Sequence, residues 1–406
     1  MHRHILSWAA IACTVAASAM THEIAISIEN PLDIARKDVP VVIATTAIDA
    51  PFIVKSATVY IGDNEIASQL DDLNGDKVAD EIAFLTDIAA RGKVEARIIV
   101  SDTAIKEERY ASRVYADMLV ATKSKKRPHA PIRSIESTNG DLYNYLHHHG
   151  PAFESELVGY RLYFDRKQTV DIYGKFNPGH EIGPSGWYPS DEQLAQGYGD
   201  DVLRVSGSCG VGTLKGWDAK KKKAIHIDPV ANRRATIVSY GPIRTVVEMA
   251  VEGWQYGSSD LDMTCRYTLY GGHRDAQVDV LFAQPLGNEV FCTGVQDIKG
   301  SQSLSDHRGL IACWGTDWPV NDTIKYAKET VGLATLLPAE VVVSEVKDKV
   351  NYLYQVSAPG ATSIRYYITF TSVKEAFGYK SAEAWWEHVT AWRKEIESPC
   401  IVTILR

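Results

Sequence analysis

The side chains most able to do chemistry are concentrated in residues 146–180, which read LHHHGPAFESELVGYRLYFDRKQTVDIYGKFNPGH. This stretch combines imidazole, carboxylate, phenol, guanidinium and amine groups. Such a set matches β-elimination beside the carboxylate of a uronic acid. That reaction needs a cation to neutralise the carboxylate, a base to remove the C5 proton, and an acid to assist departure of the oxygen at C4.

Arg161 is the candidate for binding the carboxylate, because its guanidinium fork matches a carboxylate through two parallel hydrogen bonds. Tyrosine, histidine and lysine suit proton transfer when their surroundings adjust the pKa. The expected acid or base residues are His149, Tyr160, Tyr173, Lys175 and His180. The expected substrate-binding residues are His148, Glu154, Glu156, Trp187, Tyr188, Arg244 and His273.

Two other function classes fit the same stretch. In a glycoside hydrolase, Glu154 and Glu156 would form the carboxylate pair. The two residues lie two positions apart on one strand face, however, which is a poor arrangement for flanking a substrate. A non-catalytic periplasmic glycan-binding protein would rely on exposed aromatic side chains. Trp187 and Tyr188, which stand between a glycine and a proline, favour a surface loop that stacks on a sugar ring. For any single residue, the solvated face of a hairpin is an equally good interpretation.

The histidine run 147–149 raises the question of zinc. Adjacent side chains in a strand point to opposite faces, so at most two of the three could reach one ion without a bend. His180, His226 or His273 would have to complete such a site. We expect that no cofactor is required, with a divalent cation, calcium or zinc, as the minor alternative.

A separate acidic loop carries oxygen ligands at Asp72, Asn74, Asp76 and Asp80, a spacing that can wrap calcium. Ala83 stands where an EF-hand has its glutamate, so a full EF-hand is excluded. A hairpin turn rich in Asp and Asn, without calcium, is the favoured interpretation.

The elements that position the chemical residues are expected to be strands. Residues 165–168 form a turn between two strand-like runs, 156–164 and 169–175. Because side chains alternate across a strand, Arg161 and Tyr163 share one face of the first strand. Asp171, Tyr173 and Lys175 likewise share one face of the partner strand. We expect these polar groups to line a common cleft.

The rest of the chain predicts a mainly β fold. Apolar and polar residues alternate over 24–28 and 94–100, which predicts a small N-terminal β-sandwich over residues 20–110. Residues 111–135 predict a linker or surface loop. Residues 136–406 predict a large antiparallel β-supersandwich of the galactose-mutarotase and polysaccharide-lyase type. One C-terminal helix, residues 381–397, is expected, with Ser381 as its cap.

The 406-residue chain has Arg3 near its start, then an apolar run and small residues at 17–19, which predicts an export signal over residues 1–19 and a periplasmic or secreted protein. Cys13 offers a lipoprotein alternative. No later run is long enough to cross a bilayer, and the net charge of −8 disfavours nucleic acid as a partner. The oligomeric state stays open. The cysteines after residue 19 form one or two disulfides or stay free: Cys209, Cys265, Cys292, Cys313 and Cys400.

Several motifs together resemble a known family. They are HHGPAFE at 148–154, YRLYFD at 160–165, DIYGK at 171–175 and WGTDWP at 314–319. The sequence resembles the domain of unknown function 4861 family of polysaccharide-utilising bacteria, in which at least one member is a dehydratase for ulvan oligosaccharides. The resemblance implies an oligosaccharide substrate and removal of water from a saturated uronic acid at a non-reducing end, which gives the 4,5-unsaturated sugar. It implies a carbon–oxygen lyase, either a dehydratase or an exolytic lyase.

Overall fold

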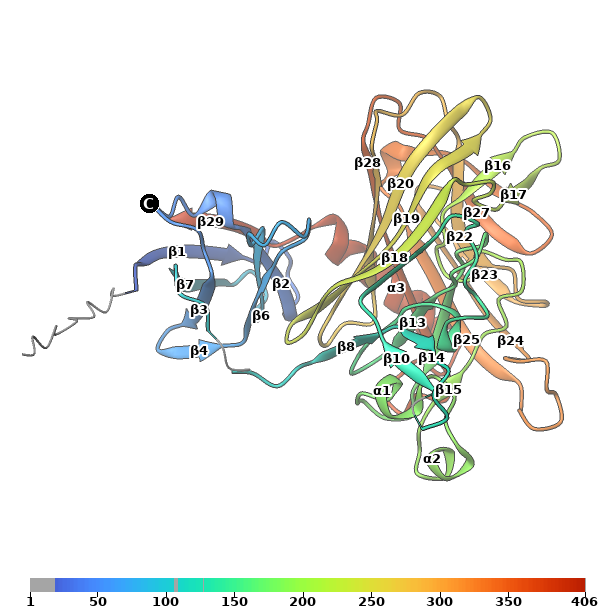
Figure 1. Cartoon of the computed structure of the whole chain (residues 1–406), viewed down its shortest axis with the longest axis horizontal. Helices are drawn as coiled ribbons and strands as arrows, with labels where there is room; N and C mark the ends of the chain where they lie inside the picture. Colours follow the sequence, from blue (N-terminus) through green and yellow to red (C-terminus); the bar gives the residue numbers. More distant parts are fainter. Residues whose placement is uncertain (1–18, 106–108, 127, 406) are drawn as a thin grey trace, which may run out of the picture.

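The computed structural model describes residues 19–105, 109–126 and 128–405. It confirms the mainly β class: a small N-terminal sandwich stands beside a larger domain of antiparallel sheets (Figure 1). The predicted export signal, including Cys13, falls in residues 1–18 outside the described part. Within the described ranges, no helix is both long and apolar enough to span a membrane.

The N-terminal sandwich packs two antiparallel sheets around one apolar core. Ile24 and Ile26 of its first strand pair with Ile98 and Ala96, and all four side chains point into the core, as the alternation predicts. The larger sheet has the order β29 (Ile401–Leu405), β1 (Thr21–Glu29), β7 (Lys93–Ser101), β3 (Ser56–Ile61) and β4 (Asn64–Ile66). The smaller sheet has the order β2 (Arg36–Ala44), β6 (Glu81–Ile88) and β5 (Ser68–Asp71).

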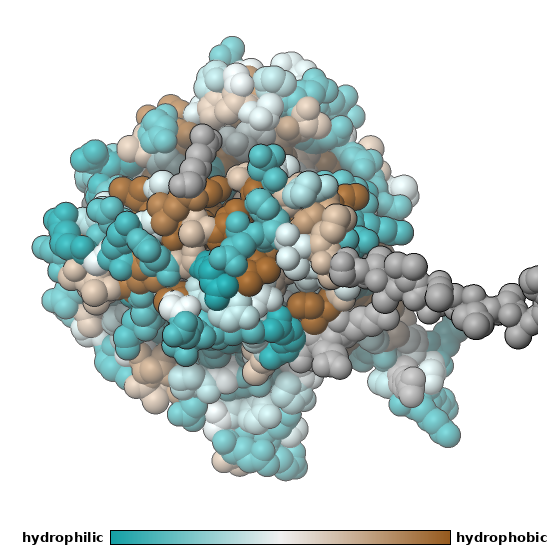
Figure 2. Space-filling view, turned by 90° about the vertical axis from the view of Figure 1, so that its left-hand side faces the viewer, coloured by the Kyte–Doolittle hydropathy of each residue, from teal (hydrophilic) through white to brown (hydrophobic). Residues whose placement is uncertain are grey.

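The last strand of the chain belongs to the first domain. Strand β29 pairs antiparallel with β1, although the sequence places it after the helix of the second domain. It forms an edge of the sheet and exposes Ile401, Val402 and Leu405. Figure 2 looks onto this end of the molecule, where hydrophobic residues show between hydrophilic ones. The predicted second domain, 136–406, is therefore too long at its C-terminal end, because residues 401–405 belong to the N-terminal sandwich.

The stretch expected as a linker, 111–135, contains paired strands instead. Strand β8 (Val114–Asp117) pairs with β12 in the second domain, and β9 (Leu119–Ala121) pairs with β10 (His129–Pro131). Val114, Ala116 and Met118 are buried. The prolines at 128 and 131 favour a loop, but burial of these apolar side chains outweighs that signal.

The second domain is built on a nine-stranded antiparallel sheet. Its order is β11 (Ser134–Ser137), β18 (Asn232–Tyr240), β19 (Arg244–Tyr256), β20 (Ser259–Tyr270), β21 (Ala276–Phe282), β28 (Ser363–Ser372), β25 (Glu329–Leu336), β24 (Leu310–Asp317) and β23 (Gln302–Ser305). The inner face carries buried residues such as Val247, Tyr267 and Tyr366 in the main core.

Two five-stranded sheets also belong to this domain, beside the two-stranded pair of β9 and β10. One has the order β15 (Asp200–Asp201), β14 (Val170–Gly174), β13 (Gly159–Leu162), β12 (Ala152–Ser155) and β8. The other has the order β17 (Lys223–Ile225), β16 (Lys215–Asp218), β22 (Phe291–Gln296), β27 (Asn351–Val356) and β26 (Val342–Lys347). Tyr160 and Leu162 of β13 share the core of the large sheet, so the predicted chemical strands form the second layer of a sandwich.

The predicted C-terminal helix is confirmed as α3 (Ala382–Glu397). The Ser381 hydroxyl accepts a hydrogen bond from the Ala384 N–H, as expected of an N-cap. Trp385 and Val389 bury one face of the helix in a cluster with residues of β24 and β25. Two shorter helices, α1 (Ile182–Ser185) and α2 (Asp191–Ala195), follow β14, and 3-10 turns occur at Thr45–Ala47, His147–His149 and Ala339–Val341.

Candidate active site

The hairpin β13–β14 has the predicted side-chain parity. Arg161 lies opposite Asp171, and Gly159 lies opposite Tyr173. The odd-numbered side chains therefore point away from the core, while Tyr160 and Ile172 point into it. The turn between the strands is held by the Asp165 carboxylate, which accepts hydrogen bonds from the N–H groups of residues 167 and 168.

Arg161 is a buried guanidinium held between two carboxylates. Its Nε and one terminal nitrogen donate to the Asp171 Oδ2 at 3.0 and 2.7 Å, and the same terminal nitrogen donates to the Asp201 Oδ2 at 2.7 Å. The guanidinium carbon lies 4.5 Å from the centre of the Trp187 ring. Arg161 is 3% exposed. The expected surface loop at Trp187 is wrong, because this ring is fully buried beneath Arg161.

The electrostatics of this cluster change the role expected of Arg161. Burial and the nearby Asp171 charge raise the pKa of Asp201, while the guanidinium partly offsets that rise. Two carboxyl groups already balance the positive charge of Arg161 and occupy its fork. Arg161 is therefore not free to clamp a substrate carboxylate through that fork, and it acts as a scaffold for its neighbours.

Two phenols are positioned by Arg161. The Tyr163 hydroxyl accepts a hydrogen bond from Arg161 at 2.9 Å and donates one to Asp171 at 2.6 Å. Its proton is therefore already used in a hydrogen bond within the protein. The Tyr188 hydroxyl also accepts from Arg161 at 2.9 Å, but its own proton has no acceptor among the described residues. Tyr188 is 47% exposed. Burial of the hydroxyl end raises the pKa of Tyr188, and Arg161 opposes the rise.

His149 faces these phenols with one free nitrogen. Its Nδ1 lies 3.0 Å from the Tyr143 carbonyl, which can only accept, so Nδ1 carries the proton and Nε2 is the basic nitrogen. Nε2 has no hydrogen-bond partner in the described part of the chain. The ring stacks on Tyr143 at 3.8 Å and lies 6.5 Å from the Tyr188 ring, centre to centre. Burial lowers the pKa of His149, which keeps the imidazole neutral.

The backbone around this cluster is strained. His148, His149 and Trp187 have φ values of 43°, 70° and 71°, in the left-handed region that residues with a Cβ rarely adopt. The chain next runs so close to β13 that a Cβ at Gly150 would lie 1.8 Å from the Leu162 carbonyl oxygen. Strain of this kind persists where the surroundings fix it and is concentrated at functional sites.

The remaining members of the cluster are Lys167 and the other two histidines. The Lys167 Nζ lies 5.4 Å from the Tyr163 ring and 5.6 Å from the Tyr143 ring, and it pairs with Asp165 at 3.3 Å. This half-buried amine is a second cation beside Tyr163, and its long stem can carry the charged end toward solvent. His148 is buried and pairs with Asp117 at 3.0 Å, so it does not reach a substrate. His147 lies 5.7 Å from the Tyr188 ring.

Comparison with known proteins identifies the family of this chain. A family model described as a domain of unknown function, DUF4861, matches residues 28–402. The chain belongs to the DUF4861 family. The family predicted from the sequence is thereby confirmed over nearly the whole chain.

Solved structures and curated proteins add less about this DUF4861 protein. It is similar to a protein in the glycosyl hydrolase family 38 from Enterococcus faecalis, with a TM-score of 0.46 and 8% identity, over 95% of this chain and 47% of that one. It is also similar to an alpha-mannosidase from Enterococcus faecalis V583, with a TM-score of 0.45 and 8% identity, over 95% of this chain and 46% of that one. The chain spans about half the length of these structures. No curated protein matches.

Three residues expected to transfer protons are structural in this DUF4861 protein. Tyr160 is fully buried, and its hydroxyl donates to the Arg274 carbonyl at 2.6 Å. Tyr173 is also fully buried and donates to the Gly199 carbonyl at 2.8 Å. The Lys175 Nζ lies at 2.6 Å from a Glu154 carboxylate oxygen and at 2.7 Å from the Ser155 carbonyl, with neither side chain exposed. Ile182 of α1 and Trp187 of the following loop pack against Tyr173 and cover this part of the hairpin face.

The buried pair Lys175–Glu154 gives a stability prediction. Replacing Lys175 with methionine should lower the free energy of unfolding by about 3 kcal/mol, because a buried carboxylate loses its partner. Glu154 keeps hydrogen bonds from the N–H groups of Glu181 and Ile182, which limits the loss. Urea unfolding measures the change. An unfolding free energy equal to that of the wild type would show that the pair does not stabilise the fold.

Three residues expected to bind substrate instead connect the two domains. Glu156 accepts from Arg113 at 2.6 Å, and Arg113 also pairs with Asp38 of the N-terminal sandwich. Arg244 is 4% exposed and pairs with carboxylates of that sandwich, Asp71 at 2.8 Å and Glu81 at 2.6 Å. The His273 Nε2 donates to the Asp38 carbonyl at 2.8 Å, and Nδ1 faces Asp275. With Glu154 also buried, the glutamate pair of a hydrolase is not available.

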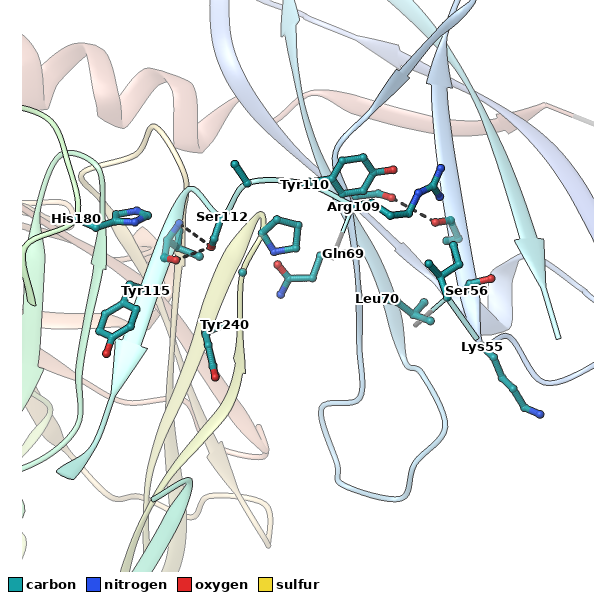
Figure 3. Close-up of a pocket in the computed structure, with 17 residues that line it drawn as sticks. Lys55, Ser56, Gln69, Leu70, Arg109, Tyr110, Ser112, Tyr115, His180 and Tyr240 are labelled. Carbon is teal, nitrogen blue, oxygen red and sulfur yellow. Dashed lines mark hydrogen bonds between the residues drawn. The ribbon is translucent and has the colours of Figure 1, made fainter. Parts of the chain in front are cut away.

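His180 lies apart from His149, at a different cavity. This cavity of about 490 Å³ lies between the sandwich and the second domain, with His180 and Tyr115 on one side and Lys55, Ser56 and Arg109 on the other (Figure 3). The His180 Nε2 is buried without a hydrogen-bond partner among the described residues. His180 therefore does not join the cluster around Arg161.

The acidic loop uses its oxygen atoms on its own backbone. Asp72 accepts from the N–H groups of Gly75 and Lys77, and Asp80 accepts from that of Leu73. Asn74 and Asp76 accept from the N–H groups two residues on. Over the described ranges, no group of three or more His, Cys, Asp or Glu side chains is arranged to hold a metal ion, at the loop or at the histidine run. The five cysteines after residue 19 are free, four of them buried.

Proposed function

We propose that this DUF4861 protein is a carbon–oxygen lyase that eliminates across C4–C5 of a uronic acid in oligosaccharides. The observation that carries the proposal is the His149 ring, whose Nε2 has no partner among the described residues and whose centre lies 6.5 Å from that of the partly exposed Tyr188 ring. The surroundings keep one group deprotonated and the other protonated at neutral pH, which is what an acid and a base in one site require.

The proposed reaction assigns each group one role. The His149 Nε2 removes the C5 proton, and the electron pair of that C–H bond forms the double bond between C4 and C5. The C4–O bond breaks, and the leaving oxygen takes the proton of the Tyr188 hydroxyl. The Lys167 ammonium neutralises the substrate carboxylate, which makes the C5 proton more acidic. Arg161 holds Tyr188 and Tyr163 in position.

The family resemblance favours a dehydratase over an exolytic lyase, since a resembling member releases water from a non-reducing uronic acid. In that case the leaving group is the C4 hydroxyl and the products are water and the 4,5-unsaturated sugar. The export signal predicted over residues 1–19 would place this reaction in the periplasm or outside the cell.

The test is incubation with a panel of uronic-acid oligosaccharides, followed by three readouts. Elimination produces ultraviolet absorbance from the conjugated double bond, whereas hydrolysis releases reducing sugar without that absorbance. Binding without either product would indicate a glycan-binding protein. The proposal expects absorbance, with a product lighter by one water if the enzyme is a dehydratase, and it fails if no panel member gains absorbance.

The pH dependence of kcat/KM follows from the two pKa shifts. Because the pKa of His149 is lowered from 6.5, the neutral base persists below pH 6.5, and activity is lost only as the pH falls through that lowered value. Because the pKa of Tyr188 is raised from 10.0, the acid stays protonated up to pH values above 10. We expect a plateau that extends from below pH 6.5 into the alkaline range. An acidic limb centred well above pH 6.5 would contradict the assignment of His149.

A further inference from the structure

A second polar surface lies on the outer face of the nine-stranded sheet. Glu248, Arg266, Asp279 and Arg365 stand side by side on β19, β20, β21 and β28. Neighbouring residues in each strand, such as Val247 and Tyr267, point into the core that also contains Tyr160 and Leu162. The row therefore faces away from the Arg161 cluster, on the opposite side of the sandwich.

The row is open because the N-terminal sandwich covers it only in part. Two cavities of about 290 and about 560 Å³ adjoin at Leu73 and lie between this face and the acidic loop. In Figure 1 the strands β18, β19 and β20 lie on the side of the second domain nearest the sandwich. Ligand sites occur preferentially at such domain interfaces.

Arginines line both cavities, and Arg365 and Arg133 are among those that keep unused donors. Arg365, with its side chain 57% exposed, donates from Nε to Asp279 at 2.6 Å, while its terminal nitrogens have no partner among the described residues. Arg133 has no carboxylate partner in the described ranges, and its guanidinium lies 4.8 Å from the centre of the Tyr240 ring. By contrast, Arg244 and Arg266 are committed to carboxylates. The free guanidinium groups favour a ligand with carboxylate or sulfate groups.

The dimensions suit an extended chain rather than a compact ligand. Adjacent strands lie about 4.8 Å apart, so the row from β19 to β28 spans about 14 Å. This is several sugar rings in length. Tyr240, which is 44% exposed at the Arg133 end, offers a ring face of the kind that stacks on sugars.

We infer that this interdomain groove binds an acidic oligosaccharide chain, with Arg365 and Arg133 contacting its anionic groups at the two ends. The choice of a glycan rests on the proposed function, whereas the preference for an anionic, extended ligand rests on the groove itself. The groove would hold a distal part of a polymer or a second chain while the Arg161 cluster acts on a chain end.

The test measures binding of a tetragalacturonide by calorimetry. The His149→Asn variant is used as background, so that turnover does not interfere. The double variant Arg133→Ala/Arg365→Ala should bind at least about tenfold more weakly, the loss shrinking at high salt. The matched control is Arg308→Ala, an exposed arginine outside both cavities, which should bind as the parent does.

Two outcomes would overturn the inference. One is unchanged affinity in the double variant, and the other is equally tight binding of the carboxyl-reduced, neutral tetrasaccharide. The proposed function fails separately: if no oligosaccharide is converted by the wild type but the double variant still weakens binding, the groove stands and the lyase does not.

Discussion

Replacing His149 with asparagine is expected to lower kcat for uronate elimination by about 10²–10⁴-fold while the protein stays folded. The loss follows because Nε2 of this ring has no hydrogen-bond partner within the described residues and the ring lies 6.5 Å from that of Tyr188, centre to centre. Asparagine tolerates the left-handed backbone at this position better than most residues with a Cβ, so the substitution removes the base with little added strain. Steady-state kinetics by ultraviolet absorbance measure kcat, and thermal unfolding checks the fold.

The chain provides a matched control for this variant at His307. This histidine also has a left-handed backbone, with φ of 58°, but its side chain is 79% exposed and pairs with Glu345, which is not a member of the Arg161 cluster. His307→Asn should keep the wild-type kcat. If His149→Asn retains kcat within a few-fold of the wild type, His149 is not the base.

Replacing Arg161 with glutamine is expected to lower the free energy of unfolding by about 3–5 kcal/mol, because the buried carboxyl groups of Asp171 and Asp201 lose their shared cation. The same change removes the donor that positions the Tyr188 hydroxyl. The folded fraction should therefore also lose activity. Urea unfolding gives the free energy, and kinetics under folded conditions give the activity.

A second substitution separates charge from packing in this result. Adding Asp171→Asn to Arg161→Gln removes one buried negative charge and should recover part of the lost stability. Arg308→Gln, at an exposed site, should change the unfolding free energy by no more than about 0.5 kcal/mol. A double variant less stable than Arg161→Gln would contradict the view that the uncompensated carboxylate causes the loss.

Local sequence patterns predict much of the fold and the face of the hairpin that carries Arg161. The alternation at β1 and β7 predicted their half-buried pairing, and Ser381 predicted the start of α3. The parity of the hairpin placed Arg161 and Asp171 on one face, as observed. Such patterns work because each is local, and burial of one strand face imposes it directly.

The sequence could not show which polar side chains are buried. Lys175 and Tyr173 share the parity of Arg161, and all three side chains are buried beneath residues of α1 and the loop to residue 201. That covering is a long-range contact without a periodic signal. Strand β29 joins the first sheet for the same kind of reason.

Four members of the cluster were missed as functional residues: Tyr143, Lys167, Asp171 and Asp201. Asp201 comes from a strand of two residues, too short for any pattern to predict. Tyr143 acts through its carbonyl oxygen and ring, which its residue type alone does not indicate. Lys167 and Asp171 lie within residues 146–180, the stretch rich in chemical side chains. Their placement beside Tyr163 follows only from the geometry of the turn between β13 and β14.

The most direct measurement follows a uronic-acid oligosaccharide carrying deuterium at C5 of its terminal unit. Our account predicts that the wild type converts it to an unsaturated product that has lost the deuterium, more slowly than the protonated substrate, and that His149→Asn fails to do so. A product that keeps the deuterium at C5 while a glycosidic bond is cleaved would show hydrolysis and would contradict the elimination.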